Sequence, residues 1–275
     1  MKKNAYLYRV SSWLKHHLTA WNTGGEGVHS PYLFEWVRMV MSDKNAYYVW
    51  SDIENVRARM LKSEDVVEFV DYGSGMRRLG EEARGKRKVR NIAKGSLAEA
   101  KYARMLFRLV NWLGHYLRDK TNGLKIVELG TSLGITTAYL ASVDSRDRVV
   151  TYEGCEVVSN IARENWNRLG LNNIECKVGE IDVCVLSKDI NVLDIAFIDA
   201  NHTYDATLAY FNVLASKVHQ KSVFVLDDIH YNEEMALAWK KICKDERVTS
   251  TIDLYQMGLV FFDKNYWRRN YIMRL

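Results

Sequence analysis

The stretch that decides the fold reads KIVELGTSLGITTAYLA and occupies residues 125–141. It begins with an apolar, β-branched run of the kind that forms a buried strand. Gly130 and Gly134 follow, and a helix is predicted to begin at about Thr136. In an open α/β sheet, ligands bind beyond the carboxyl ends of the parallel strands, where such a glycine loop lies. The stretch therefore predicts a nucleotide-type binding loop at the first strand of a parallel sheet.

Further strand-like runs follow at intervals that leave room for helices. They are RVVTYEG (148–154), NIECKVGE (173–180), LDIAFIDA (193–200) and SVFVLDD (222–228). Alternating strands and helices predict a parallel sheet with helices on both faces. The last two runs, STIDLY (250–255) and GLVFF (258–262), are separated only by Gln256 and Met257. Because that link is too short for a crossover helix, these two runs are predicted to form an antiparallel hairpin.

The residues around the loop narrow the choice of ligand. Ser132 and Leu133 interrupt the G-x-G-x-x-G spacing, and no basic residue is present to hold a pyrophosphate. Glu128 beside the loop suits a ligand with a positive end. Glu153 ends the second strand, where a carboxylate can accept both hydroxyls of a ribose. S-adenosylmethionine, with an ammonium, a sulfonium and one ribose, meets these requirements.

The motifs IVELGTSLGITTAYLA (126–141), TYEG (151–154) and FIDANHTYDAT (197–207) carry a family resemblance. Over roughly residues 121–275 the chain resembles the class I S-adenosylmethionine-dependent methyltransferases, and the small-molecule O-methyltransferases in particular. The resemblance implies a Rossmann-like α/β fold, with a mostly parallel sheet ending in an antiparallel hairpin. Ser132 stands where many members have a middle glycine. The implied cofactor residues are Glu128, Gly130, Thr131, Ser132 and Gly134 for the methionine part, Glu153 for the ribose, Glu180 by the adenine, and Asp199.

Polar side chains follow the fourth and fifth strands, where a methyl acceptor would be activated. DANH (199–202) follows LDIAFI, and DDIH (227–230) follows SVFVL. Resemblance to the catechol O-methyltransferase-like group implies Mg²⁺ held by Asp199, Asp227 and Asp228, with His202 in the place of a lysine base. Carboxylates suit a hard divalent ion, and histidine titrates near neutrality, so it can accept a proton from a hydroxyl. Catalytic roles are predicted for His202 and Asp199.

Two departures from that group keep alternatives open. Asp228 replaces an asparagine, and His202 replaces the lysine. In the alternative interpretation, Asp199 only orients the cofactor or the loop backbone. Asp227 and Asp228 would then cap the following helix, and His202 would be a structural histidine. Metal dependence and the identity of the base are therefore hypotheses.

Residues 1–120 are predicted to form a helical segment in front of a methyltransferase domain at residues 121–275. Five apolar residues recur at three- and four-residue steps and define one face of a first helix: Leu7, Val10, Leu14, Leu18 and Trp21. This face is predicted to pack on the protein's own domain or on a partner subunit. A helix lying on a membrane surface is the alternative. The segment as a whole is expected to act as a lid and substrate-selecting element, or in oligomerisation.

Three local features complete the N-terminal segment. Ser96 and Glu99 form a capping box, which predicts a helix from Ser96 to near Lys120. The stretch VDYGSG (70–75) looks like a second cofactor loop but lacks a following helical face, so we interpret it as an ordinary loop. The basic stretch at residues 77–90 is interpreted as solvated surface, with capture of an acidic substrate or nucleic acid as alternatives.

The composition is that of a globular protein, with 275 residues, 48% hydrophobic and 27% charged. One proline excludes a Pro-rich linker, and a net charge of +5 permits an acidic partner without requiring one. Four cysteines without zinc-type spacing indicate reduced thiols in a cytoplasmic protein. No apolar run approaches the roughly 20 residues that span a bilayer, so membrane insertion is not expected.

Methylation of an oxygen on a small hydroxylated metabolite is the predicted function. A methyltransferase acting on RNA or protein is a weaker alternative, because no recognition module or Asn/Asp-Pro-Pro-Tyr site is present. A nicotinamide-dependent oxidoreductase would need the absent G-x-G-x-x-G spacing. A binding protein that keeps the fold without catalysis stays open, as do a homodimeric state and the identity of the acceptor.

Overall fold

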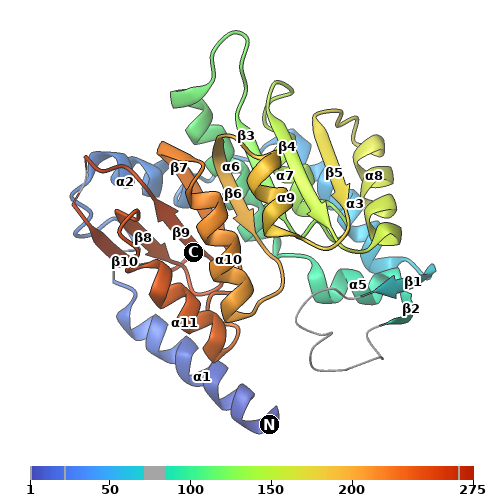
Figure 1. The fold of residues 1–275 in the computed structure, drawn as a ribbon, viewed down its shortest axis with the longest axis horizontal. Coiled ribbons are helices and arrows are strands. Elements are labelled where there is room, and N and C mark those ends of the chain that lie inside the picture. The colour runs from blue at the N-terminus through green and yellow to red at the C-terminus, as the bar shows by residue number, and fades with distance from the viewer. Residues whose placement is uncertain (1, 22, 71–83, 266) are drawn as a thin grey trace. The chain divides into compact units, whose positions relative to one another are not determined.

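The computed structural model describes residues 2–21, 23–70, 84–265 and 267–275. The chain divides into two compact units, one made of Met1–Asp43 with Val183–Leu275 and the other of Lys44–Asp182. Neither limit coincides with the boundary predicted at residue 120. Figure 1 shows the elements of both units. In the described ranges, no helix combines the length and apolar character that a bilayer-crossing segment needs.

The unit Lys44–Asp182 holds three parallel strands in the order β3–β4–β5. They are β3 (Lys125–Leu129), β4 (Arg148–Glu153) and β5 (Ile174–Val178). Helices α7 (Ile135–Ala141) and α8 (Glu156–Arg168) follow β3 and β4, as the sequence predicts. Four of the five residues of β3 are buried. A strand that is covered on both faces needs a continuous apolar run, and the sequence of β3 provides one.

The N-terminal part of the same unit packs on these helices. It comprises α3 (Tyr48–Lys62), α5 (Val89–Ser96) and α6 (Ala100–Leu117). Trp50 and Ile53 of α3 share a core cluster with Phe107 of α6, Tyr139 of α7 and Trp166 of α8. These buried rings bind the helical segment to the α/β layer, so it is part of the same compact unit as the glycine loop.

Two expectations for this segment were wrong. A hairpin of β1 (Val66–Val70) and β2 (Arg84–Lys88) interrupts the predicted all-helical run. The charged sequence of its second strand, RGKRK, shows no apolar alternation and gave no strand signal. The capping box is also absent: Ser96 ends α5 and donates its hydroxyl to the Ile92 carbonyl, while α6 begins at Ala100 without a side-chain cap. The stretch at residues 71–83, including most of VDYGSG, lies outside the described residues.

The unit Met1–Asp43 with Val183–Leu275 holds five strands in the order β6–β7–β9–β8–β10. They are β6 (Leu193–Ile198), β7 (Val218–Leu226), β8 (Ser250–Asp253), β9 (Gly258–Phe261) and β10 (Arg269–Ile272). β6 and β7 are parallel, and β9 is antiparallel to both β7 and β8. The predicted C-terminal hairpin is therefore confirmed. β10, which adds a parallel strand beside β8, was not foreseen.

Helices cover both faces of this five-stranded part. They are α9 (Val183–Asp189), α10 (Tyr204–Ala215) and α11 (Glu233–Ile242), with α1 (Lys2–Thr19), α2 (Pro31–Trp36) and a π-helix (Val37–Met41) from the chain start. Phe211 of α10 meets Phe224 of β7 with ring centroids 6.0 Å apart. Trp36 of α2 meets Phe261 of β9 at 6.2 Å. Phe261 is in register with Val223, not Phe224, so the two rings lie on opposite faces.

The parallel strands of each unit and the C-terminal antiparallel hairpin agree with the mostly parallel sheet that the sequence predicts.

Candidate active site

The loop after β3 adopts a left-handed backbone at three positions. Gly130 has φ +97°, Ser132 φ +47° and Gly134 φ +74°, and α7 starts directly after Gly134. Glycine adopts this conformation without steric cost, whereas Ser132 does so at a cost that its surroundings must offset. The loop is thus a compact turn of the kind that brings backbone amides close to a ligand.

Glu128 lies beneath this loop and is fully buried. Its Oε2 accepts hydrogen bonds from the Thr137 hydroxyl at 2.5 Å and from the Thr151 hydroxyl at 2.6 Å. The Thr151 oxygen also lies 2.6 Å from that of Thr131 in the loop. Glu128 therefore connects β3, β4, the loop and α7 through hydrogen bonds. This is a positioning role, whereas the sequence predicts that Glu128 binds the methionine part of the cofactor.

Glu153, at the end of β4, holds the loop from the other side. Its Oε2 accepts from the Ser132 amide at 2.8 Å, and its Oε1 accepts from the Cys155 amide at 2.8 Å. Each carboxylate oxygen of Glu153 thus accepts a backbone amide, one from the loop and one from the residues after β4. These bonds hold the carboxylate at the strand end where the sequence predicts the ribose acceptor, and that role stays a prediction.

Gly134 is a second fixed point that the sequence indicated only as a turn residue. A Cβ on it would lie 2.5 Å from Trp166 Nε1 and 2.8 Å from Ala162 Cβ. The Trp166 indole donates to the Gly134 carbonyl at 2.8 Å, and Asn165 donates to the Leu133 carbonyl at 2.9 Å. Two α8 side chains thus hold the loop backbone, which sequence reasoning missed because they lie about thirty residues downstream.

The remaining cofactor residue of this unit is Glu180, which lies just after β5 and is exposed. The preceding Gly179 (φ +130°) donates its amide to the Glu153 carbonyl at 2.9 Å. The ends of β4 and β5 are therefore adjacent, as an adenine-side role for Glu180 requires. That role stays a prediction.

In the other unit, Asp199 and His202 follow β6 and face each other. His202 Nε2 lies 3.3 Å from Asp199 Oδ1, and both side chains are about one-fifth exposed. Asn201 (φ +63°), His202 (φ +26°) and Asp228 (φ +55°) all have left-handed backbones. Such strain in non-glycine residues gathers at functional sites. The residue pattern gave no direct sign of it at His202, although Asn and Asp tolerate this conformation.

Asp227 directly follows β7 and is buried, 5% exposed. Burial raises the pKa of its carboxyl well above the ordinary value, and the charges of Asp199 and Asp228 raise it further. The pKa of Asp228 is raised by burial, while His202 opposes this shift. The four predicted residues of this unit are thus brought into one electrostatic cluster.

The helix-capping alternative for Asp227 and Asp228 is wrong, because α11 starts later. Asn232 is its N-cap and accepts from the Met235 amide at 2.8 Å. Across the described ranges, no three His, Cys, Asp or Glu side chains come together in a way that could hold a metal ion. The carboxylates interact through their charges without converging on one point.

Asp253 is the residue of this region that sequence reasoning missed. Its carboxylate lies 2.8 Å from His230 Nε2 and 3.2 Å from His16 Nε2, and it accepts from the Trp239 indole and the Tyr255 amide. Burial alone raises its pKa, but the hydrogen bonds from His16 and His230 outweigh burial and hold the pKa well below the ordinary range. No sequence signal joins residues 16, 230 and 253.

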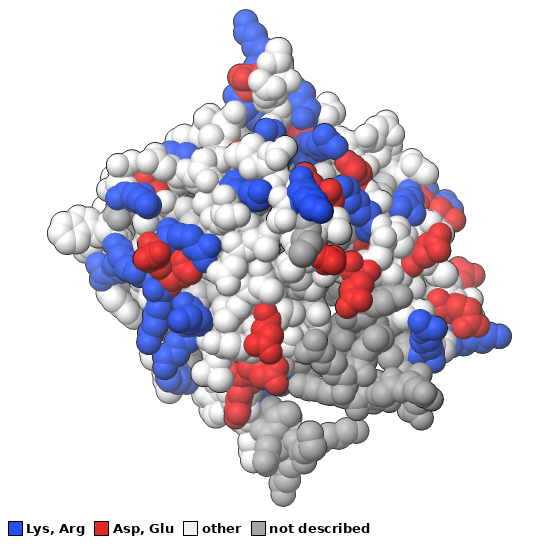
Figure 2. Space-filling view, in the orientation of Figure 1, with Lys and Arg blue, Asp and Glu red and all other residues white. Residues whose placement is uncertain are grey.

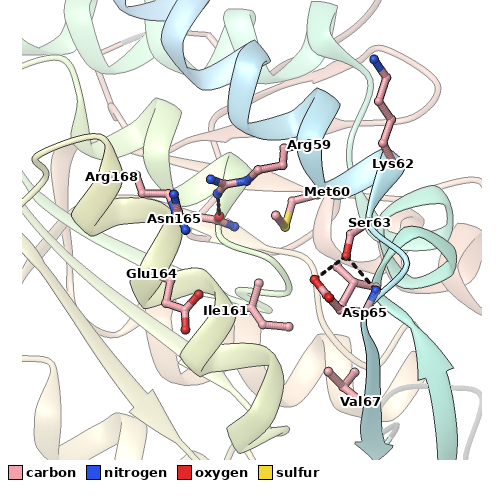
Figure 3. A pocket seen from close by; sticks show the side chains of 11 residues that line it. Arg59, Met60, Lys62, Ser63, Asp65, Val67, Ile161, Glu164, Asn165 and Arg168 are labelled. Carbon is pink, nitrogen blue, oxygen red and sulfur yellow. Dashed lines mark hydrogen bonds between the residues drawn. The ribbon is translucent and has the colours of Figure 1, made fainter.

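A cavity of about 380 Å³ lies in the unit that carries the glycine loop, between α3, the β1–β2 hairpin, α5 and α8 (Figure 3). Arg59, Lys62 and Arg168 bring positive charge to it, and Asp65 and Glu164 bring negative charge. Arg59 also donates to Asn165 at 2.9 Å, the residue that holds the loop at Leu133. The N-terminal segment thus lines a cavity through Arg59. Asn165, which lines the same cavity, also holds the backbone of the glycine loop.

In the described part of the basic stretch, basic side chains form ion pairs at the protein surface. Lys88 and Arg90 both bind Glu64, the former at 2.6 Å, and the hydrogen bond from Lys88 lowers the Glu64 pKa. Residues 77–83 of the stretch lie outside the described residues. Figure 2 shows acidic and basic side chains interspersed over the face it draws. These observations agree with the interpretation as solvated surface.

Comparison with known proteins finds one family model that matches the region of the candidate site. Residues 127–229 match the family model described as "Methyltransferase domain". No curated protein matches the chain. The match spans the glycine loop, Glu153, the Asp199–His202 pair and Asp227–Asp228.

Solved structures share the fold at low identity. An O-methyltransferase from Bacillus cereus in complex with SAH is 18% identical, with a TM-score of 0.52 over 82% of this chain and 95% of the other. TomG, an O-methyltransferase of tomaymycin synthesis from Streptomyces achromogenes in complex with SAM, is 16% identical, with a TM-score of 0.53 over 83% and 99%. A putative caffeoyl-CoA O-methyltransferase from Staphylococcus aureus is 15% identical, with a TM-score of 0.52 over 63% and 90%.

The predicted resemblance to the class I S-adenosylmethionine-dependent methyltransferases is confirmed by this match and this fold. Residues 127–229 match a methyltransferase domain, and the chain has the fold of the class I methyltransferases.

Proposed function

We propose that the protein transfers the methyl group of S-adenosylmethionine to an oxygen of a small hydroxylated molecule in the cytoplasm. The observation that carries the proposal is the loop between β3 and α7. Its left-handed backbone at Gly130, Ser132 and Gly134 is held in place by the Glu153 carboxylate. That arrangement, inside a methyltransferase domain, offers amides and a ribose acceptor at one strand end.

The cofactor residues have separable tasks in this proposal. Glu153 would accept the ribose hydroxyls, while Gly130, Thr131, Ser132 and Gly134 line the methionine side. Glu128 acts from below by fixing the threonines on which the loop rests. When bound, S-adenosylmethionine supplies an electrophilic methyl group on its sulfonium. The protein has then to place a nucleophile in line with it and make that nucleophile electron-rich.

His202 is the proposed general base, with Asp199 as its orienting partner. The Asp199 carboxylate beside Nε2 favours the tautomer that carries its proton there, which leaves Nδ1 as the basic nitrogen. A neutral imidazole so held can accept the hydroxyl proton as the acceptor oxygen attacks. The positively charged imidazole that results is stabilised by the carboxylates of Asp199 and Asp228.

Use of Mg²⁺ is a second candidate feature, favoured by one observation. Asp227 Oδ1 is buried, and no described residue donates a hydrogen bond to it. A divalent cation would relieve the repulsion between this carboxyl and its acidic neighbours. However, the described side chains do not form a three-ligand group, so Asp199 or Asp228 would have to turn toward Asp227.

The decisive experiment follows S-adenosylhomocysteine release over a panel of hydroxylated metabolites, with and without Mg²⁺. Calorimetry with S-adenosylmethionine and NAD accompanies it. The proposal requires binding of S-adenosylmethionine and turnover of at least one hydroxyl acceptor. Binding without turnover on any acceptor, including RNA and protein substrates, would assign the chain to a binding role instead.

A further inference from the structure

The apolar face of α1 points away from the protein. Its side chains are among the most exposed large hydrophobic groups of the described residues. Leu18 is 86% exposed, Leu7 57% and Leu14 49%. We call this surface the α1 stripe; it comprises Leu7, Val10, Trp13, Leu14 and Leu18, with Trp21 just after the helix. The sequence predicts that this face packs on the protein's own domain or on a partner subunit; the exposure contradicts the first of these alternatives and leaves the second untested.

The opposite, polar face of α1 is the one that docks. Ser12, His16 and Ala20 recur every four residues, and His16 and Ala20 are 5% and 4% exposed. Tyr255 donates its hydroxyl to the Arg9 carbonyl at 3.0 Å, and Arg9 Nε donates to the Tyr231 carbonyl at 3.2 Å. Turning the helix to bury the α1 stripe would break these bonds and the His16–Asp253 contact. The polar contacts thus specify the orientation of α1, and the apolar face stays exposed as a candidate interaction surface.

The charge of α1 indicates which partner suits this face. Residues 2–19 contain Lys2, Lys3, Arg9 and Lys15, with two histidines and no Asp or Glu. A helix that exposes leucines and Trp13 and whose charged residues are all basic has the composition of a helix that lies in a lipid interface. Two copies of α1 packed together would bring like charges close without any acid on either helix.

We propose that α1 binds the surface of an anionic lipid bilayer, with the α1 stripe in the boundary between headgroups and acyl chains. The tryptophans suit that boundary because their rings are apolar with one polar N–H. Lys15, which is exposed, would meet lipid phosphates. The inference goes beyond the proposed function and does not depend on methyl transfer, since it rests on α1 alone.

Vesicle co-sedimentation of the full chain tests the proposal. The vesicles are phosphatidylcholine alone, or phosphatidylcholine with about one-third phosphatidylglycerol. The wild-type chain should sediment with the anionic vesicles, less so at high salt. Leu14→Glu with Leu18→Glu should weaken binding more than about tenfold, because two inserted side chains become charged. Leu237→Glu on α11, at a residue as exposed as Leu7 (57%), should bind like wild type.

Further variants separate charge from apolar insertion. Lys15→Glu should weaken binding to anionic vesicles several-fold and leave any binding to neutral vesicles unchanged. Trp13→Ala removes an exposed ring without adding charge and should also weaken binding. It is used in place of Leu14→Glu with Leu18→Glu if circular dichroism shows that this double variant is unfolded. Failure of the wild-type chain to bind anionic vesicles overturns the proposal. A second result would also overturn it: light scattering shows a dimer, the double variant Leu14→Glu with Leu18→Glu is monomeric, and the wild-type chain does not bind vesicles.

Discussion

The Glu153 carboxylate accepts a hydrogen bond from the Ser132 amide at 2.8 Å and so joins the end of β4 to the loop after β3. One side chain therefore serves both as loop support and as the proposed ribose acceptor. Both tasks need the charged carboxylate, and the second needs lone pairs beyond those that the amide bonds use.

Replacing Glu153 by alanine should weaken S-adenosylmethionine binding by about 1 to 3 kcal/mol, because the ribose and the Ser132 amide both lose a charged acceptor. Titration calorimetry measures the change. Glu175→Ala is the matched control, since Glu175 lies on the adjacent β5 and pairs with Arg148 at the surface. Unchanged affinity in the Glu153 variant would remove this residue from the cofactor site.

Replacing His202 by alanine should reduce turnover about 10²- to 10⁴-fold while cofactor affinity stays nearly intact, the scale on which a general base contributes. His219→Ala is the matched control, because His219 forms a similar pair with Asp194 at 2.8 Å near the starts of β7 and β6. Equal rates for the His202 variant and wild type would exclude a base at this position.

Gly134→Ala should destabilise the fold more than Gly170→Ala does. Both glycines have left-handed backbones, at φ +74° and +68°, but a Cβ at Gly170 meets nothing within 4 Å. The Gly170 variant should cost about 1 to 2 kcal/mol for the backbone alone. At Gly134, the clash with Trp166 should add about 1 to 3 kcal/mol. Urea unfolding of the two variants measures the difference, and equal costs would contradict a close contact between the loop and α8.

Asp253→Asn should lower the free energy of unfolding at pH 7 by about 3 to 5 kcal/mol, because His16 and His230 lose a buried carboxylate partner. Since the pKa of Asp253 is depressed in the fold, its contribution is present above the ordinary carboxyl pKa of about 4. That contribution is lost as the pH falls from there toward the depressed value. Denaturation from pH 7 to pH 3 should show the two proteins converging. Asp194→Asn, at a carboxyl paired with the single histidine His219, should show a smaller loss. A constant gap at all pH values would contradict the assignment.

Asp227→Asn should have the opposite pH dependence. Burial and then the charges of Asp199 and Asp228 raise the Asp227 pKa, so the fold favours the neutral acid. Wild-type stability is therefore reduced as pH rises from about 4 toward the raised pKa, whereas an amide has no proton to lose. The variant should gain in melting temperature relative to wild type as pH increases.

The same pair of proteins tests the metal. If Mg²⁺ binds here, it should raise the melting temperature of the wild type and not that of Asp227→Asn, and a chelator should abolish turnover. Full activity in chelator, with no thermal shift on adding Mg²⁺, would exclude a metal at this strand end.

The strands that carry the site could be predicted because continuous apolar runs such as those of β3 and β6 need burial on both faces. The strands β10 and β2 were not predicted because Arg269, Asn270 and the run RGKRK carry no such pattern. The helix α1 was found, but its orientation was not. Periodicity identifies an apolar face without saying what covers it, and polar contacts to Tyr231 and Asp253 decided the outcome.

The site divides in the same way. Motif spacing could place Glu153 and Asp199 at strand ends, since each follows an apolar run directly. It could not place Asp253, whose partners His16 and His230 are separated from it by 237 and 23 positions in the chain. Nor could it reveal the strained backbone at His202 and Asp228, which depends on the packing of the loops.

The contact between Gly134 and Trp166 has an evolutionary consequence. A side chain cannot appear at position 134 while the indole at position 166 stays in place, because a Cβ and Nε1 would be 2.5 Å apart. Among descendants of this sequence, residue 134 should stay glycine wherever residue 166 is tryptophan. Substitution of Gly134 should therefore require an earlier change of Trp166 to a smaller residue. Position 166 thus controls which residues position 134 can accept.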